Sequence, residues 1–156
     1  MIELINVSKS YPTSELYSEL NLRLNSGNKV GLVGRNGSGK STLFKLVLAE
    51  EQPDSGEIVI PKNYKIGALK QYFNFTEKTL IEETALALGE DDQYNIYKAE
   101  KILFGLGFSQ EDLEKAPKEF SGGYQIRINL AKLLLTEPNM LLLDEPTNYL
   151  DILSIR

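Results

Sequence analysis

Two stretches of the chain combine residue types and spacings that suit nucleotide chemistry. Residues 34–41 read Gly-Arg-Asn-Gly-Ser-Gly-Lys-Ser and match the pattern G-x-x-x-x-G-K-S in full. Residues 141–146 read Leu-Leu-Leu-Asp-Glu-Pro, an apolar run that ends in two adjacent carboxylates. We expect the first stretch to hold a triphosphate and the second to handle its magnesium ion and the attacking water. Together they predict nucleotide hydrolysis.

The glycine-rich stretch predicts a phosphate-binding loop. Glycines allow successive backbone N–H groups to point at phosphate oxygens, and the helix that follows turns its positive dipole end to the same anion. We expect Lys40 to place its charge on the β- and γ-phosphates and Ser41 to ligate magnesium. A glycine-rich turn that binds nothing is the alternative. The residues expected to contact the nucleotide are Gly34, Arg35, Asn36, Gly37, Ser38, Gly39, Lys40, Ser41 and Thr42.

The acidic stretch predicts a strand that delivers catalytic groups. Asp144 is placed to hold magnesium, directly or through water, and Glu145 to orient or deprotonate the attacking water. A core strand that simply leaves into an acidic turn at Pro146 is the alternative. Beside a phosphate-binding loop, that alternative is the weaker interpretation.

Composition narrows the chemistry further. The chain of 156 residues fits one domain, and it has no cysteine and no histidine, which excludes disulfides, His catalysis and most zinc chemistry. A formal net charge of -5 argues against a surface that is basic throughout and made for nucleic acid or anionic lipid. We see neither a signal peptide nor an apolar run of about 18 residues, so we expect a cytoplasmic protein that does not insert into a membrane.

Hydrophobic periodicity predicts an α/β fold. We expect strands near residues 2–7, 18–24, 57–60, 65–69 and 140–143, and a short buried strand over residues 29–33. We expect helices near residues 42–49, 96–104 and 123–136, a capping box at Thr79–Glu82, and a possible helix start at Ser109. Residues 1–71 and 117–156 are interpreted as an α/β core with an antiparallel β part, and residues 72–116 as a helical subdomain. The remaining acidic side chains, such as Glu82, Glu83, Glu90 and Asp91, are expected on a solvated face, and Phe73 and Phe75 in the packing.

Residues 120–135, Phe-Ser-Gly-Gly-Tyr-Gln-Ile-Arg-Ile-Asn-Leu-Ala-Lys-Leu-Leu-Leu, resemble the signature motif of ABC-type ATPases. The order of the other motifs is similar as well, and the resemblance covers the whole chain. Thr147-Asn148 after the Glu-Pro pair, with Tyr124 in the signature, resembles the ABC-F branch, although Tyr149 stands where that branch usually has histidine. The resemblance implies a P-loop NTPase core with a small β subdomain and a helical subdomain.

The resemblance also implies roles for further residues, with ATP and Mg2+ as the cofactors. Tyr11 matches the aromatic that stacks on adenine, and Gln71 matches the glutamine that touches magnesium and the catalytic water. Ser121, Gly122 and Gly123 match the loop that closes on the γ-phosphate of a nucleotide held by another module. Asp151 matches a loop that communicates between paired modules. The alternatives are a surface tyrosine, a polar strand end, and ordinary helix caps at Ser121 and Asp151.

Three functions follow as hypotheses. The first is an ATPase module of an ABC-F protein that pairs with a second module and acts on ribosomes. The second is the motor subunit of a transporter with a membrane-spanning partner, and the third is a nucleotide-binding module without turnover. Similar ATPases continue beyond the acidic strand, with a later strand that ends in a histidine. We therefore expect the chain to be incomplete at its C-terminus, and to be poorly stable or rearranged when isolated.

Overall fold

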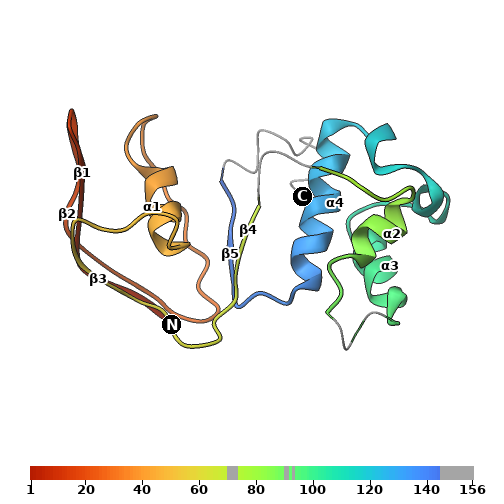
Figure 1. Cartoon of the computed structure of the whole chain (residues 1–156), viewed down its shortest axis with the longest axis horizontal. Helices are drawn as coiled ribbons and strands as arrows, with labels where there is room; N and C mark the ends of the chain where they lie inside the picture. Colours follow the sequence, from red (N-terminus) through yellow and green to blue (C-terminus); the bar gives the residue numbers. More distant parts are fainter. Residues whose placement is uncertain (70–73, 90–91, 93, 145–156) are drawn as a thin grey trace. The chain divides into compact units, whose positions relative to one another are not determined.

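The computed structural model describes residues 1–69, 74–89, 92 and 94–144. Three residues expected to be functional, Gln71, Glu145 and Asp151, lie outside this part of the chain. The described chain forms two compact units, Met1–Ile66 and Gly67–Arg156, and each is described here by itself. Figure 1 labels the helices and strands. The division into a core and a helical subdomain of residues 72–116 stays a prediction.

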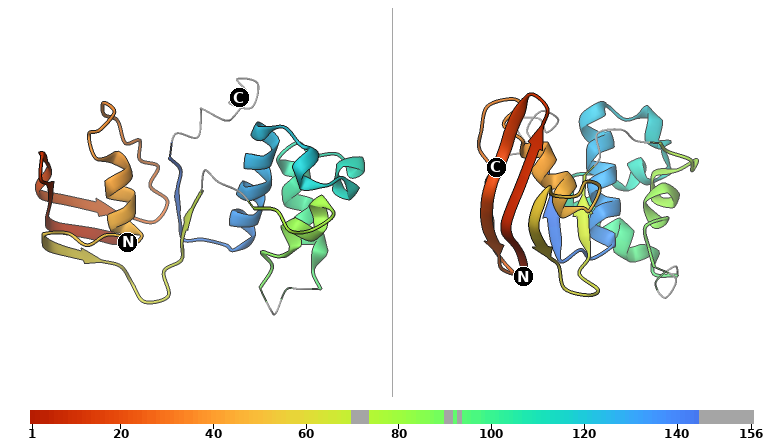
Figure 2. Two further views of the ribbon diagram at one scale, coloured as in Figure 1. Left: turned by 45° about the horizontal axis from the view of Figure 1, so that its top comes forward. Right: turned by 60° about the vertical axis from the view of Figure 1, so that its left-hand side comes forward.

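The first unit contains an antiparallel sheet. Its strands are β1 (Ile2–Tyr11), β2 (Ser14–Leu24) and β3 (Ser55–Val59), in the order β2-β1-β3. Leu4 pairs with Leu22 on β2, and Ile2, Leu4 and Val7 are buried. The strands expected at residues 2–7, 18–24 and 57–60 are thus present, and β1 extends as far as Tyr11. Figure 2 shows β1 and β2 side by side.

Residues 29–33 do not form the buried strand that the sequence predicts. No strand is assigned there, and Val30 and Val33 expose 63% and 96% of their surface. A short apolar run takes up strand structure only when neighbouring strands satisfy its backbone groups. Among the described residues of the first unit, no strand pairs with this segment. The prediction was therefore wrong about structure and burial.

Helix α1 (Lys40–Val47) follows the glycine-rich loop and buries Leu43, Leu46 and Val47. It ends in a Schellman motif, in which the Glu50 N–H donates to the Lys45 carbonyl at 2.9 Å and the Ala49 N–H to the Leu46 carbonyl at 3.1 Å. Ala49 has a φ of 56°, in the left-handed region where glycine is usual. This turn ends the helix and redirects the chain at Glu50.

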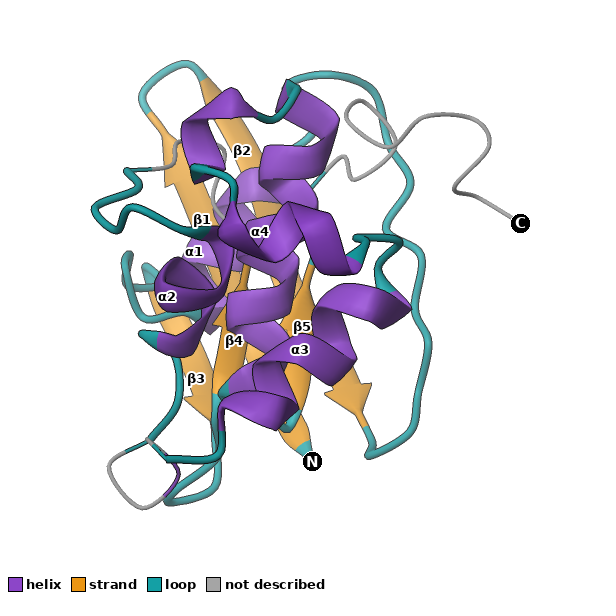
Figure 3. Cartoon of the chain, turned by 90° about the vertical axis from the view of Figure 1, so that its right-hand side faces the viewer, coloured by secondary structure: helices purple, strands orange, loops and turns teal. Residues whose placement is uncertain are grey.

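The second unit is mainly helical. It contains α2 (Leu80–Ala85), α3 (Ile96–Gly105), the 3-10 helices η2 (Gln110–Glu114) and η3 (Pro117–Glu119), and α4 (Gly122–Leu135). Figure 3 shows these helices in purple. Strand β4 (Ile66–Ala68) pairs with β5 (Met140–Leu142) among the described residues. The core consists of Phe75, Leu80, Leu103, Phe108, Leu113, Ile128 and Ala131.

Two predicted helix starts are confirmed in this unit. At Thr79, the Glu82 N–H donates to the Thr79 hydroxyl, and the Thr79 N–H donates back to the Glu82 carboxylate at 3.2 Å. Ser109 is the N-cap of η2, and its N–H donates to Asp112 Oδ2 at 2.9 Å. Within the described ranges, no helix has the length and apolar character needed to cross a membrane.

Candidate nucleotide site

The predicted phosphate-binding loop of the first unit contains glycines at positive φ. Gly37 and Gly39 have φ values of 81° and 95°, a backbone conformation that is strained for residues with a side chain. Gly39 is the N-cap of α1, and its carbonyl accepts from the Leu43 N–H at 2.9 Å. The loop therefore ends at a helix N-terminus, where unpaired N–H groups and the helix dipole favour an anion.

The Lys40 side chain folds back onto the loop. Its ammonium donates to the carbonyls of Gly34 and Arg35 at 2.9 and 3.0 Å. At Gly34, an added Cβ would lie 2.4 Å from the Ser38 hydroxyl, so the loop closes tightly on itself. A closed loop with an inserted ammonium and a helix N-terminus fits the polyphosphate of a nucleotide. This set of groups supports the expected binding role of residues 34–42.

Tyr17 on β2 contacts this loop, which the sequence analysis did not foresee. Its hydroxyl donates to the Gly39 carbonyl at 2.7 Å, and a Cβ at Gly39 would meet that hydroxyl at 2.9 Å. Burial raises the pKa of Tyr17, so the hydroxyl keeps its proton at neutral pH. No local signal could have found this contact, because it joins residues 22 positions apart. Tyr17 thus holds Gly39, the last residue before α1, through this hydrogen bond.

Replacing Tyr17 by phenylalanine is expected to loosen the loop. We expect tripolyphosphate affinity to fall about threefold and the unfolding free energy by about 1 kcal/mol, because one partly buried hydrogen bond is lost. Calorimetric titration and urea unfolding would measure the two effects. Tyr97→Phe, at an exposed tyrosine of α3, is the matched control. Unchanged affinity in Tyr17→Phe would show that the hydroxyl does not shape the loop.

Tyr11, the residue expected to stack on adenine, ends β1 and exposes 40% of its surface. Its hydroxyl donates to Glu51 Oε2 at 2.6 Å, and the Lys9 ammonium lies 5.7 Å from its ring centroid. The ring is therefore held at its hydroxyl end while part of it remains accessible. Stacking on a base stays a prediction.

The expected magnesium ligands are distributed over both units. Ser41 lies in the first turn of α1, and Asp144 follows β5 after Leu143. Each is placed only within its own unit, and Gln71 lies outside the described residues. The expected catalytic Glu145 is likewise outside them. The strand that leads to Asp144 is confirmed at Met140–Leu142.

The signature residues begin α4, as predicted. Ser121 is the N-cap, and Gly122 and Gly123 are the first residues of the helix. The Ser121 side chain makes no cap hydrogen bond, while its carbonyl accepts from the Gln125 N–H at 2.9 Å. Ser121 is therefore a helix cap, as the alternative expected, although its side chain makes no cap hydrogen bond.

Three aromatic rings fix the start of α4 within the second unit. Phe108 meets Phe120 edge-on at 5.5 Å and Tyr124 at 5.3 Å between ring centroids. The Arg127 guanidinium lies 4.6 Å from the centroid of the Tyr124 ring and donates to the Leu106 carbonyl at 3.2 Å. This aromatic cluster joins the residues after α3 to the first turn of α4.

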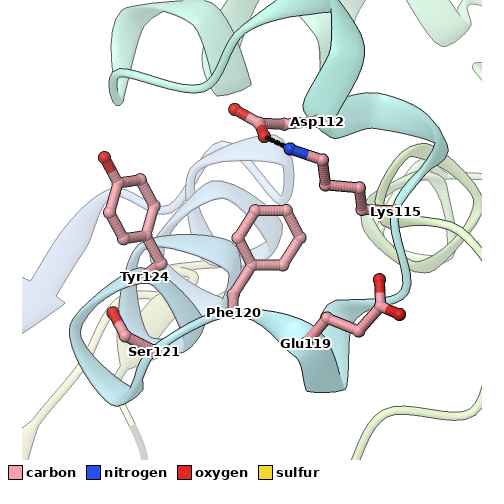
Figure 4. A pocket seen from close by; sticks show the side chains of 6 residues that line it. All are labelled: Asp112, Lys115, Glu119, Phe120, Ser121 and Tyr124. Atoms are coloured by element: carbon pink, nitrogen blue, oxygen red, sulfur yellow. Dashed lines mark hydrogen bonds and ion pairs between the residues drawn. The ribbon is translucent and has the colours of Figure 1, made fainter.

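A hollow of about 370 Å³ lies beside Ser121. Figure 4 shows the side chains that line it. Asp112 and Lys115 form an ion pair of 2.7 Å on one side of it. Hydrogen bonds from Lys115 and from Ser109 lower the pKa of Asp112 to about 2. The residues that line the hollow are Asp112, Lys115, Glu119, Phe120, Ser121 and Tyr124.

Comparison with known proteins places these features in a family. A sequence model of the family described as "ABC transporter" matches residues 17–148. The "Energy-dependent translational throttle protein EttA" of Escherichia coli (strain K12) is 39% identical over 159 residues, which cover 100% of this chain and 29% of the relative. The "ABC transporter F family member 5" of Arabidopsis thaliana is 32% identical over 195 residues, covering 97% of this chain and 28% of the relative.

The chain is also similar in structure to a solved ATP-binding cassette. The dimeric structure of a post-hydrolysis state of the ATP-binding cassette MJ0796, bound to ADP and Pi, has a TM-score of 0.77 and 26% identity. The match covers 99% of this chain and 78% of that chain, whereas the chain spans less than a third of the two curated relatives. The predicted fold is confirmed, and the relatives named here include an F family member, as the signature predicted. The chain belongs to the ABC transporter family, and it folds as an ABC ATPase cassette.

Proposed function

We propose that this chain is the ATP-binding and ATP-hydrolysing module of a cytoplasmic ABC-F protein that acts on ribosomes. The observation that carries the proposal is the loop of residues 34–39, closed on itself, with the Lys40 ammonium folded into it. A cation, a helix N-terminus and glycines at positive φ form an anion site without any further side chain. The description of the matched cassette MJ0796 as bound to ADP and Pi supports the polyphosphate of ATP as that anion.

Each predicted site residue has a role in this proposal. Lys40 binds the β- and γ-phosphates, and Ser41, Gln71 and Asp144 hold Mg2+. When bound, the ion offsets the negative charge of the phosphates. Glu145 orients the attacking water and accepts its proton. Tyr11 offers its ring to the base.

Pairing with a second module is part of the proposal. The Ser121 side chain makes no cap hydrogen bond, so a γ-phosphate held by a facing module is a suitable acceptor for its hydroxyl. The matched cassette MJ0796 is described as a dimer. We propose that ATP holds two modules together and that hydrolysis releases them.

The ribosome is proposed as the target because of the relatives. One is named as a translational throttle protein and another as an F family member. Thr147-Asn148 and Tyr124 point to the same branch. A transporter's motor subunit would use the same chemistry but would bind a membrane-spanning partner instead.

Replacing Glu145 by glutamine is the direct test of hydrolysis. We expect kcat for phosphate release to fall at least about 100-fold, because the proton acceptor for water is lost. ATP affinity should remain, since Lys40 and the loop are intact. Glu114→Gln, at an exposed carboxylate of η2, is the matched control. Equal turnover in Glu145→Gln and the original chain would refute the assignment.

Sedimentation with ribosomes tests the target. In the presence of ATP, the Glu145→Gln protein should co-sediment with ribosomes, because it binds ATP but does not hydrolyse it. Adding Lys40→Ala should remove this association. Co-purification with membranes rather than ribosomes would favour the transporter alternative.

A further inference from the structure

The Tyr11 ring is held by a carboxylate that no predicted function has used. The Tyr11 hydroxyl donates to Glu51 Oε2 at 2.6 Å, and the Lys45 ammonium donates to Glu51 Oε1 at 3.0 Å. The hydrogen bond from Tyr11, followed by that from Lys45, lowers the pKa of Glu51. Glu51 is therefore ionised at neutral pH, and both of its oxygens are engaged by specific donors.

Glu51 reaches Tyr11 because of how α1 ends. The Schellman motif around Ala49 turns the chain back after the helix, and the Glu51 N–H still donates to the Lys45 carbonyl at 3.3 Å. The backbone of Glu51 is thus hydrogen-bonded to α1, the helix that follows the phosphate-binding loop. One short helix connects the loop at its N-terminus with Glu51 just beyond its C-terminus.

The neighbours of Tyr11 on β1 bind the same segment. The Lys9 ammonium donates to the Gln52 carbonyl at 2.8 Å. The Ser10 N–H and hydroxyl both donate to Asp54 Oδ2, at 2.7 and 3.0 Å. Three consecutive residues at the end of β1 are therefore bound to residues 51–54, and this fixes the backbone from which the Tyr11 ring projects.

We propose that Glu51 is a positioning residue that holds the Tyr11 ring in the orientation needed to stack on a nucleotide base. The proposal rests on the proposed nucleotide-binding function. A half-exposed tyrosine otherwise samples several rotamers, and restricting it beforehand reduces the entropy that stacking would cost. Since the hydroxyl is bound to Glu51, stacking on a base would use a face of the ring and not the hydroxyl.

A comparison of two ligands separates positioning from general damage. ATP would contact Tyr11 with its base and the phosphate-binding loop with its phosphates, whereas tripolyphosphate would contact only the loop. We expect Glu51→Ala in the full chain to weaken ATP binding about fivefold, since one hydrogen bond orients the ring, and to leave tripolyphosphate binding unchanged. Isothermal titration calorimetry measures both affinities without requiring turnover.

Three further variants test the mechanism. Glu51→Gln keeps an oxygen that accepts from the Tyr11 hydroxyl, so it should restore most of the ATP affinity. Tyr11→Phe removes the donor, so its ATP affinity should match that of Glu51→Ala. Combining the two substitutions should weaken ATP binding no further. Glu50→Ala, at the exposed neighbouring carboxylate, is the control for loss of charge.

The outcomes are distinct. A selective loss of ATP affinity that does not add to Tyr11→Phe supports the positioning role. An equal loss for both ligands, or none for either, overturns it while the proposed nucleotide binding stands. If the original chain binds neither ligand, the proposed function fails and the role of Glu51 fails with it.

Discussion

Glu83→Ala is expected to lower the unfolding free energy of the second unit by about 3–5 kcal/mol, the range for breaking a buried ion pair. The Glu83 side chain is 1% exposed and forms an ion pair with Lys132 of α4. It also accepts from the Thr76 and Glu77 N–H groups at 2.8 and 3.0 Å. Removing it leaves a cation and two amides without this partner, all at once.

Urea unfolding followed by circular dichroism would measure this loss. Glu114→Ala, which removes an exposed carboxylate of the same unit, should change stability by less than about 0.5 kcal/mol. The stability loss in Glu83→Gln should lie between those in Glu83→Ala and Glu114→Ala, because an amide oxygen still accepts from the backbone N–H groups. A loss in Glu83→Ala no larger than in Glu114→Ala would show that the pair contributes nothing.

Protonation of Glu83 at acid pH should also destabilise the second unit. Burial raises the pKa of Glu83, but hydrogen bonds from Glu77, Lys132 and Thr76 outweigh it and leave the pKa below the ordinary value of 4.5. The unfolded chain therefore binds this proton more tightly than the folded chain. The contribution is fully present above pH 4.5 and is lost as the pH falls through the lowered pKa. Glu83→Ala should consequently show a smaller loss of stability over this acid range.

Lys40→Ala is expected to reduce ATP affinity at least about 100-fold, because the charge-assisted contacts to the phosphates are lost. The Lys40 ammonium is the cation that the structure places at the carbonyls of Gly34 and Arg35. Tripolyphosphate binding should fall in parallel, since the lost contact is to phosphate and not to the base. Titration of labelled ATP would measure the change.

Lys62→Ala is the matched control for this charge change, because Lys62 is an exposed lysine of the same unit. Its ATP affinity should equal that of the original chain. Circular dichroism would confirm that Lys40→Ala remains folded. Equal and negligible ATP binding by the original chain and Lys40→Ala would overturn the nucleotide site altogether.

Local sequence signals predicted much of the fold. The glycine spacing located the loop before α1, and the Thr79–Glu82 pair located the start of α2, because both signals act within a few residues. Residues 29–33 were predicted wrongly, because an apolar run does not specify which strand will pair with it. Phe75 is buried, as predicted, and Phe73, Glu90 and Asp91 lie outside the described residues.

Contacts between distant residues could not be predicted in this way. Glu83 was expected on a solvated face, yet it is buried, while its neighbour Glu82 forms the capping box. Successive residues of a helix point about 100° apart, so adjacent glutamates face different surroundings. Its partner Lys132 lies 49 positions away, and Tyr17 and Glu51 likewise act on residues 22 and 40 positions away.

The aromatic cluster of Phe108, Phe120 and Tyr124 limits how this protein can diverge. Each ring fills space beside the other two, so shrinking one leaves a void that only enlargement of a neighbour would refill. We therefore expect these three positions to co-vary among homologues, with summed side-chain volume better preserved than identity at any single position.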